Sequence, residues 1–212
     1  LHLTFAPMLD VCRDPRWGRI SEGPGEDAFV GAAMARAKTR GYQGGDLSKP
    51  GCVGATAKHF IAYGAAEAGR DYAAVDVSER QLAEIFLPPF KAAVEAGVAA
   101  IMPAFNDLAG VPMTAHAALL DGLLRKRWNF DGVLVSDYTA VLELLNHGVA
   151  ADLTEAAAMA INAGVDIDMM SQAYVACLPE ALERGLVSMA TIDVAVARVL
   201  ALKERLGLFD DP

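Results

Sequence analysis

The 212 residues are 54% hydrophobic and 21% charged, a balance that supports a buried core and excludes a mainly disordered chain. The net charge of −9 argues against a nucleic-acid partner, because binding phosphates requires a concentrated basic surface. Charged residues interrupt every apolar stretch before it could span a membrane. The three cysteines have neither disulfide nor metal-ligand spacing, and we expect no metal and no cofactor.

Short apolar runs alternate with amphipathic segments along the chain. The apolar runs predict buried strands at Leu3–Val11, Val53–Phe60, Ala99–Asn106, Gly132–Tyr138 and Gly164–Met170. The amphipathic segments predict helices at Asp27–Gly41, Ser78–Ala96, Ala115–Trp128, Thr139–Leu145, Thr154–Ala163 and Thr191–Leu206. The last helix is followed by Asp210–Pro212, which is typical of a domain end.

This alternation is typical of an α/β fold with a parallel sheet. Polar residues at the C-terminal ends of the predicted strands favour a TIM-type (β/α)8 barrel over a doubly wound open sheet, because barrel enzymes place their chemistry there. A complete barrel has eight strand–helix units, whereas the sequence predicts about five. We therefore expect residues 1–212 to form an incomplete barrel with two open sheet edges.

A long loop, Asp10–Asp27, follows the first predicted strand and is rich in Arg, Asp, Glu and Gly. Such charges are costly unless they pair with each other or with a ligand. The loop is therefore either internally salt-bridged or presents one guanidinium that forks onto vicinal sugar hydroxyls.

Lys58 and His59 end the second predicted strand. Adjacent strand residues point to opposite faces, so a barrel holds both inside only if the strand bends or ends there. The two side chains are either part of a structural ion pair or donors that bind hydroxyls and keep a carboxylate ionised. The next loop, Tyr63–Tyr72, contains a second candidate sugar-binding arginine, Arg70.

Asp137 ends the fourth predicted strand, where an isolated carboxylate is costly to bury. It is either a cap of the following helix or a catalytic group. Asp168 follows a similar apolar run, and there we favour a structural role.

Several ordered segments together resemble glycoside hydrolase family 3, and within it the bacterial periplasmic β-glucosidases. The matching segments are Phe5–Val11, Asp14–Arg19, Glu22–Asp27, Lys58–Gly64, Gly69–Tyr72, Leu87–Ala93, Leu134–Tyr138, Ala163–Met169 and Gly207–Pro212. The sequence lacks the Gly-x-Gly-Asp…Asp-Ser-His loop of the family's N-acetylglucosaminidase branch. The resemblance therefore favours the glucosidase branch.

The resemblance implies site residues. Asp137 would be the nucleophile, and glycone-binding residues would be Arg19, Lys58, His59, Arg70, Met102 and Tyr138. We expect Arg19, Lys58, His59 and Arg70 to lie in one pocket around Asp137. The chain departs from many members in having Phe105 instead of Tyr, which removes a hydroxyl near the nucleophile, and Tyr138 instead of Trp.

The resemblance also implies that residues 1–212 are part of the catalytic barrel of a larger, periplasmic or secreted enzyme. Upstream barrel segments would precede them, and a second domain carrying the acid/base Glu would follow. The enzyme would hydrolyse terminal non-reducing β-D-glucosyl residues of a small glucoside or oligosaccharide by double displacement. We expect the isolated chain to be unstable, to associate through its open edges as a homo-oligomer, or to hydrolyse glucosides poorly.

Two alternatives to a glycosidase remain open from the residues. One is a barrel lyase in which Lys58 forms a Schiff base with a carbonyl substrate. The other is a sugar-binding fragment without catalytic activity.

Overall fold

The computed structural model describes residues 1–210, so Asp211 and Pro212 of the predicted domain end lie outside the described residues. The chain divides into two compact units. The first contains Leu1–Met113 together with the residues from Lys203 onward, and the second contains Thr114–Leu202. The fold is α/β with parallel strands, as the sequence predicts.

Three parallel strands form the centre of the first unit: β1 (Leu3–Thr4), β2 (Gly54–Phe60) and β3 (Ala100–Pro103), in that spatial order. The predicted first strand is shorter than expected, because after β1 its regular pairing resumes only at the bridge between Met8 and Lys58. Pro7 lies between these two points and lacks a backbone N–H. Its carbonyl still accepts from the Lys58 N–H at 3.0 Å, which keeps this segment beside β2.

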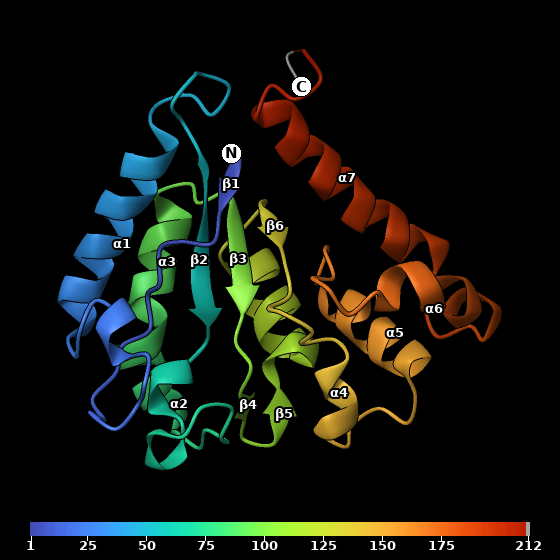
Figure 1. Cartoon of the computed structure of the whole chain (residues 1–212), viewed down its shortest axis with the longest axis horizontal. Coiled ribbons are helices and arrows are strands. Elements are labelled where there is room, and N and C mark those ends of the chain that lie inside the picture. Colours follow the sequence, from blue (N-terminus) through green and yellow to red (C-terminus); the bar gives the residue numbers. More distant parts are fainter. Residues whose placement is uncertain (211–212) are drawn as a thin grey trace. The chain divides into compact units, whose positions relative to one another are not determined.

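Helices α1 (Ala28–Gln43) and α3 (Leu87–Glu95) pack against each other and both contact β2 (Figure 1). Helix α1 begins at the Asp27 cap, whose carboxylate accepts from the Val30 N–H at 2.8 Å. The Gln43 side chain, at the end of α1, accepts from the Ala99 N–H at 2.8 Å and donates to the Gly97 carbonyl at 2.8 Å. This side chain ties α1 to the start of β3.

The helical segment predicted at Ser78–Ala96 is continuous but not α-helical throughout. It consists of α2 (Glu79–Gln81), a π-helical stretch at Leu82–Phe86, and α3. The predicted Ser78–Gln81 capping box is confirmed. Pro88 and Pro89 lack the N–H groups that would continue a regular α-helical ladder, and the π-helical stretch precedes them.

A short hairpin that the sequence did not predict follows β3. Strands β4 (Asp107–Leu108) and β5 (Val111–Pro112) are antiparallel. Ala109 and Gly110 connect them with positive φ, and the Asp107 carboxylate accepts from the Gly110 N–H at 3.0 Å. The turn lacks the Asn-Gly or Asp-Gly pair that marks such hairpins most clearly.

The second unit contains β6 (Val133–Leu134) and four α-helices, of which α7 continues past the unit's end. These are α4 (Glu143–Asn146), α5 (Leu153–Ala163), α6 (Ala173–Glu183) and α7 (Met189–Arg205) (Figure 1). A π-helical segment at Ala118–Arg127 corresponds to the helix predicted at Ala115–Trp128. The remaining predicted helices overlap α4, α5 and α7.

The predicted strand at Gly164–Met170 reduces to one bridge, between Val135 and Ile167. The two segments are nevertheless parallel and hydrogen-bonded, because Ser136 N–H donates to the Ile167 carbonyl at 2.8 Å. The carboxylates of Asp166 and Asp168 accept hydrogen bonds from the backbone N–H groups of Leu134 and Ala173. These side-chain contacts replace the regular pairing between strands.

Helix α6 was not predicted, because Pro179 lies inside it and argues against a helix. The Asp168 carboxylate accepts from the N–H groups of Ala173 and Tyr174, at 2.7 and 3.3 Å. Satisfying these first donors stabilises the helix start. The structural role favoured for Asp168 is therefore confirmed. Within residues 1–210, no helix combines the length and the apolar character needed to cross a membrane.

Candidate active site

The C-terminal end of β2 presents Lys58 and His59. Lys58 pairs with Met102 of β3 and Phe60 pairs with Pro103, so the register shifts at His59. A bulge of this kind interrupts the regular alternation of side chains. Such a bend is required if Lys58 and His59 are to point to the same side of the sheet, and the bulge lies at this point. Lys58 is half-buried, and His59 is buried.

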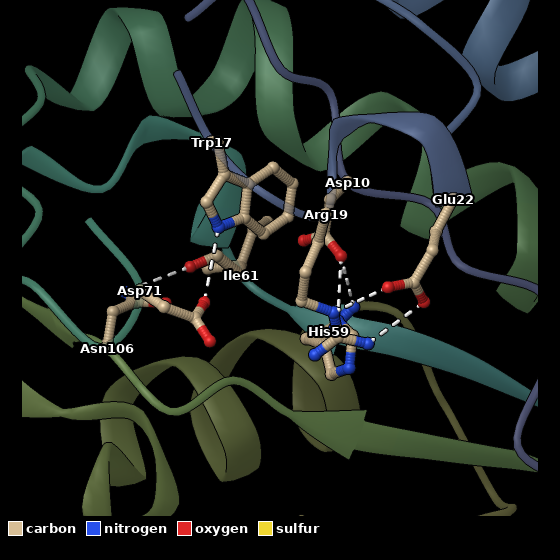
Figure 2. Close-up of polar contacts among 8 residues, drawn as sticks. All are labelled: Asp10, Trp17, Arg19, Glu22, His59, Ile61, Asp71 and Asn106. Atoms are coloured by element: carbon tan, nitrogen blue, oxygen red, sulfur yellow. Dashed lines mark hydrogen bonds and ion pairs between the residues drawn. The ribbon is translucent and has the colours of Figure 1, made fainter. Parts of the chain in front are cut away.

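His59 is held by Asp10, which follows the segment paired with β2. One Asp10 carboxylate oxygen, Oδ2, lies 2.8 Å from His59 Nδ1 and accepts from the His59 backbone N–H at 3.0 Å (Figure 2). The side chains of His59 and Asp10 are 1% and 0% exposed. Because an ionised carboxylate only accepts hydrogen bonds, Nδ1 is the protonated ring nitrogen in the neutral imidazole. Nε2 is therefore the ring nitrogen directed away from Asp10.

Arg19 forms a bidentate pair with Glu22 beside this site (Figure 2). Arg19 Nε and Nη2 donate to the two Glu22 carboxylate oxygens at 2.8 and 3.1 Å. Hydrogen bonding from Arg19 lowers the pKa of Glu22, and the nearby charge of Lys58 lowers it further. These three side chains thus form one electrostatic cluster. Arg19 Nη1 lies outside the fork that binds Glu22.

The Arg19–Glu22 pair predicts a pH dependence of stability. The folded-state pKa of Glu22 lies below the usual value of 4.5, so the pair stabilises the protein above that pH and stops doing so as the pH falls. The two side chains are 25% and 44% exposed, and pairs of this kind contribute at most about 1 kcal/mol. We expect the melting temperature of Glu22→Gln to fall less than that of the parent between about pH 6 and pH 3, by roughly 2–4 °C at most. Equal slopes in both proteins would contradict this.

The other arginines of the Asp10–Asp27 loop are used internally. Arg16 forms a bidentate pair with Asp14, with its shortest contact at 2.7 Å, and Arg13 donates to the Glu26 carbonyl at 3.2 Å. Hydrogen bonding from Arg16 lowers the pKa of Asp14 to about 2. The internally salt-bridged interpretation therefore describes this part of the loop.

Arg70 lies in a loop that packs on the Asp10–Asp27 loop. Trp17 Nε1 donates to the Asp71 carboxylate at 3.3 Å (Figure 2). Gly69 has a φ of +66° and lies so close to the other loop that an added Cβ would be 2.8 Å from the Trp17 backbone nitrogen. Arg70 itself is exposed. These contacts position the two arginine-bearing loops relative to each other.

We expect Gly69→Ala to destabilise the protein by about 2–4 kcal/mol, because alanine is strained at positive φ and its Cβ would meet backbone atoms that cannot swing aside. The matched control is Gly18→Ala in the facing loop, where nothing lies within 4 Å of the added Cβ. Its cost should stay within about 0.5 kcal/mol. Chemical denaturation of both variants measures this, and similar costs would show that the loop contact is unimportant.

Aromatic rings line the site. Tyr63 makes edge contacts with His59 and Trp17, at centroid distances of 5.2 and 5.1 Å, and the Arg19 guanidinium lies 5.8 Å from its centroid. Phe105 packs against Tyr72 at 4.3 Å. Burial, followed by the nearby Asp71 carboxylate, raises the pKa of Tyr63, so its phenol stays neutral. Met102, which pairs with Lys58 in the sheet, is also buried.

In the second unit, Asp137 follows β6 and is 8% exposed. Its Oδ1 accepts from the Tyr138 N–H at 2.7 Å, but α4 begins only at Glu143. Asp137 is therefore not the N-cap of that helix. Burial raises the pKa of Glu143, and the negative charge of Asp137 raises it further, so these carboxyl groups are electrostatic neighbours. Tyr138 is 58% exposed and presents its ring to solvent.

Backbone contacts hold the position of Asp137. The Ser136 hydroxyl accepts from the Met169 N–H at 2.8 Å and donates to the Asp137 carbonyl at 3.0 Å. Thr139 N–H donates to the Met169 carbonyl at 2.9 Å. The residues on both sides of Asp137 are thus fixed to the segment that the sequence predicts as the fifth strand.

A separate ion-pair network lies elsewhere in the second unit. Buried Asp166 accepts from Arg125 at 2.6 Å, from Arg198 at 3.0 Å and from the Leu134 N–H at 2.8 Å. Burial raises the pKa of Asp166 and lowers that of Arg125 to about 10. Among the described residues, no group of three or more His, Cys, Asp or Glu side chains is arranged to hold a metal ion.

Two contacts of the site were not predicted from the sequence. One is the pairing of Asp10 with His59, which is 49 residues away. The other is the pairing of Glu22 with Arg19. For Glu22 a signal exists, because oppositely charged residues three apart can meet in a helical turn, and Ile20–Glu22 forms one.

Comparison with known proteins identifies relatives over nearly the whole chain. Residues 1–202 match the model of the glycosyl hydrolase family 3 N-terminal domain. A periplasmic β-glucosidase of Salmonella typhimurium is 44% identical over all of this chain, which covers 28% of that protein. A putative β-xylosidase of Formosa agariphila is 40% identical, again over all of this chain and 29% of that protein.

Solved structures agree. The β-glucosidase of Listeria innocua in complex with glucose is 46% identical and superimposes with a TM-score of 0.97. The match covers the whole of this chain and 30% of the Listeria protein. A family 3 exo-β-xylosidase in complex with a xylobiose aziridine probe is 33% identical, with a TM-score of 0.90. The chain therefore spans less than a third of the length of these relatives.

Proposed function

We propose that this chain, which belongs to glycosyl hydrolase family 3, supplies the nucleophile and the glycone-binding side chains of a retaining β-glucosidase. Asp137 is the nucleophile, and Arg19, Lys58, His59, Arg70, Met102 and Tyr138 bind the sugar. The observation that carries the assignment is Asp137 itself: a buried carboxylate shortly after β6, held next to Tyr138 and not at the N-cap of α4.

The proposed reaction has two steps. A carboxylate oxygen of Asp137 attacks the anomeric carbon, the glycosidic C–O bond breaks, and the leaving oxygen takes a proton from a carboxylic acid. Water then attacks the same carbon and gives its proton to that carboxylate, and the ester to Asp137 breaks. The product retains the β configuration because the anomeric carbon is inverted twice.

The acid/base group lies outside this set of side chains. A general acid needs a raised pKa, whereas Arg19 lowers the pKa of Glu22 and keeps it anionic. Glu22 is thus better suited to orient Arg19. We propose that the acid/base Glu belongs to a further domain, in keeping with the short span of this chain relative to its relatives.

The cationic cluster suits a neutral, hydroxyl-rich ligand. Arg19 keeps Nη1 outside its bond to Glu22, and Lys58 and His59 contribute further nitrogen atoms beside it. Charge-assisted hydrogen bonds from Arg19 and Lys58 bind vicinal hydroxyls with a defined geometry. A Listeria innocua relative is known in complex with laminaribiose, a glucose disaccharide, which supports a glucoside as the substrate.

The substrate proposal is tested with the protein at its full natural length. We expect aryl β-glucosides to be hydrolysed with a higher kcat/KM than aryl β-xylosides, with β-glucose as the first product seen by NMR. A higher kcat/KM for xylosides would show that the protein is a β-xylosidase, a class of enzyme to which it is also similar. α-Glucose as the first product would overturn the retaining mechanism.

Membership in a glycosidase family also weighs against the Schiff-base alternative for Lys58. A Lys58 Schiff base with a carbonyl substrate would be trapped by borohydride, and we expect no such adduct. If the chain is instead a sugar-binding fragment, calorimetry would show glucose binding without turnover.

A further inference from the structure

We propose that Asp10 is a positioning residue that fixes the ring orientation and the tautomer of His59, so that Nε2 accepts a hydrogen bond from a glycone hydroxyl. This inference rests on the proposed function, because it requires His59 to contact the sugar. It adds a residue to the site and gives His59 a defined hydrogen-bonding role.

The geometry of the pair carries the inference. One oxygen of Asp10 holds both the backbone N–H and the ring nitrogen Nδ1 of His59, at 3.0 and 2.8 Å. Two bonds from a single oxygen to the same residue fix the side-chain torsion as well as the position of the backbone. Since the carboxylate accepts only, the proton stays on Nδ1 and the lone pair of the neutral ring stays on Nε2.

Packing restrains the ring from its other side. Tyr63 makes an edge contact with His59 at 5.2 Å, and Tyr63 is itself packed against Trp17. The bulge in β2 places His59 where the ladder to β3 is irregular, so the sheet alone does not define its side-chain direction. Asp10 and Tyr63 supply that definition.

Stability alone is a poor reason for this aspartate. Asp10 is completely buried, and within the described residues its second oxygen, Oδ1, has no hydrogen-bond partner. A buried oxygen without a partner costs free energy, and a buried ion pair is weak evidence of net stabilisation. A group kept at such a cost is better explained by what it does to His59.

A double-mutant cycle in the protein at its full natural length tests the inference. Asp10→Ala removes the acceptor, and Asp10→Asn keeps an acceptor oxygen but loses the charge. We expect kcat/KM for an aryl glucoside to fall about 100-fold in the first and about 10-fold in the second. Because Asp10 acts through His59, the Asp10→Ala, His59→Ala double variant should lie within about threefold of His59→Ala alone.

The matched control is Asp166→Asn. Asp166 is also a buried carboxylate that accepts from a backbone N–H and from a side chain, but it belongs to the Arg125–Arg198 network. Its replacement should lower the melting temperature without changing discrimination among deoxyglucosides. The Asp10 variants should lose that discrimination for the same hydroxyl as His59→Ala.

The outcomes separate this inference from the proposed function. The first outcome is that His59→Ala lowers kcat/KM and that the losses from Asp10→Ala and His59→Ala add up in the double variant. The positioning role of Asp10 is then wrong, and the sugar-binding role of His59 stands. If His59→Ala keeps parental kinetics, His59 does not bind the sugar and both proposals fail at this residue. Neither result bears on the role proposed for Asp137.

A measurement on the unaltered protein covers the case in which the Asp10 variants do not fold. NMR with nitrogen-15-labelled histidine, at mildly alkaline pH, reports which ring nitrogen carries the proton, and the His59 signals are assigned from their loss in His59→Gln. We expect Nδ1 to be protonated and Nε2 to be unprotonated. The opposite tautomer would overturn the inference.

Discussion

Asp137→Ala is expected to lower the rate of aryl-glucoside hydrolysis by about 10,000-fold or more in the protein at its full natural length. Without a nucleophile no covalent intermediate forms, and removing such a group typically costs this much. Added azide should partly restore turnover, because a small anion fits the space vacated by the carboxylate and attacks the same face of the sugar. The product should then be α-glucosyl azide.

Asp168→Asn is the matched control for this prediction. Asp168 follows the neighbouring hydrogen-bonded segment, and its carboxylate caps α6. Its replacement should lower the melting temperature while leaving kcat close to that of the parent. If Asp168→Asn were as inactive as Asp137→Ala, and azide rescued neither, the loss of activity would reflect damage to the fold.

Lys58→Ala and Arg19→Ala are expected to lower kcat/KM by about 10- to 100-fold each. Losing a charged hydrogen bond to a hydroxyl costs roughly 1.5–3 kcal/mol. Lys49→Ala is the matched control, because Lys49 is 70% exposed and paired only weakly, at 3.8 Å, with Asp46. Parental kinetics in Lys58→Ala would remove that residue from the site.

Deoxyglucosides make this test specific. A substrate that lacks the hydroxyl bound by Lys58 should be hydrolysed equally well by the parent and by Lys58→Ala, since the bond is absent in both. Arg19→Lys should behave more like Arg19→Ala than like the parent, because lysine cannot reproduce the fork that holds Glu22. An equal loss for every substrate would indicate a structural role.

Much of the fold is readable from local sequence. The apolar run at Gly54–Phe60 and the Asp27 cap of α1 identify their elements, because periodicity and capping depend on residues close in sequence. Helix α6 was not predicted, because a proline inside a segment, here Pro179, argues against a helix. The strand expected at Gly164–Met170 was shortened because Asp166 and Asp168 use their carboxylates to bind backbone N–H groups.

The site was predictable in part. Lys58 and His59 stand out because polar residues at the end of a buried strand are costly without a purpose. The partner of His59 did not stand out, because Asp10 is 49 residues away and only the parallel pairing beside β2 brings it near. The roles of Asp137, Arg19, Arg70, Met102 and Tyr138 came from the family resemblance, and they stay predictions.

Covalent labelling tests the central claim most directly. A 2-fluoro-β-glucoside with a good leaving group should esterify the full-length protein, because the fluorine slows both steps whereas the good leaving group speeds only the first. Peptide mapping by mass spectrometry then locates the ester. We expect it on Asp137, within the peptide that contains Leu134–Tyr138. An ester on Asp10, Asp168 or any glutamate would contradict the assignment.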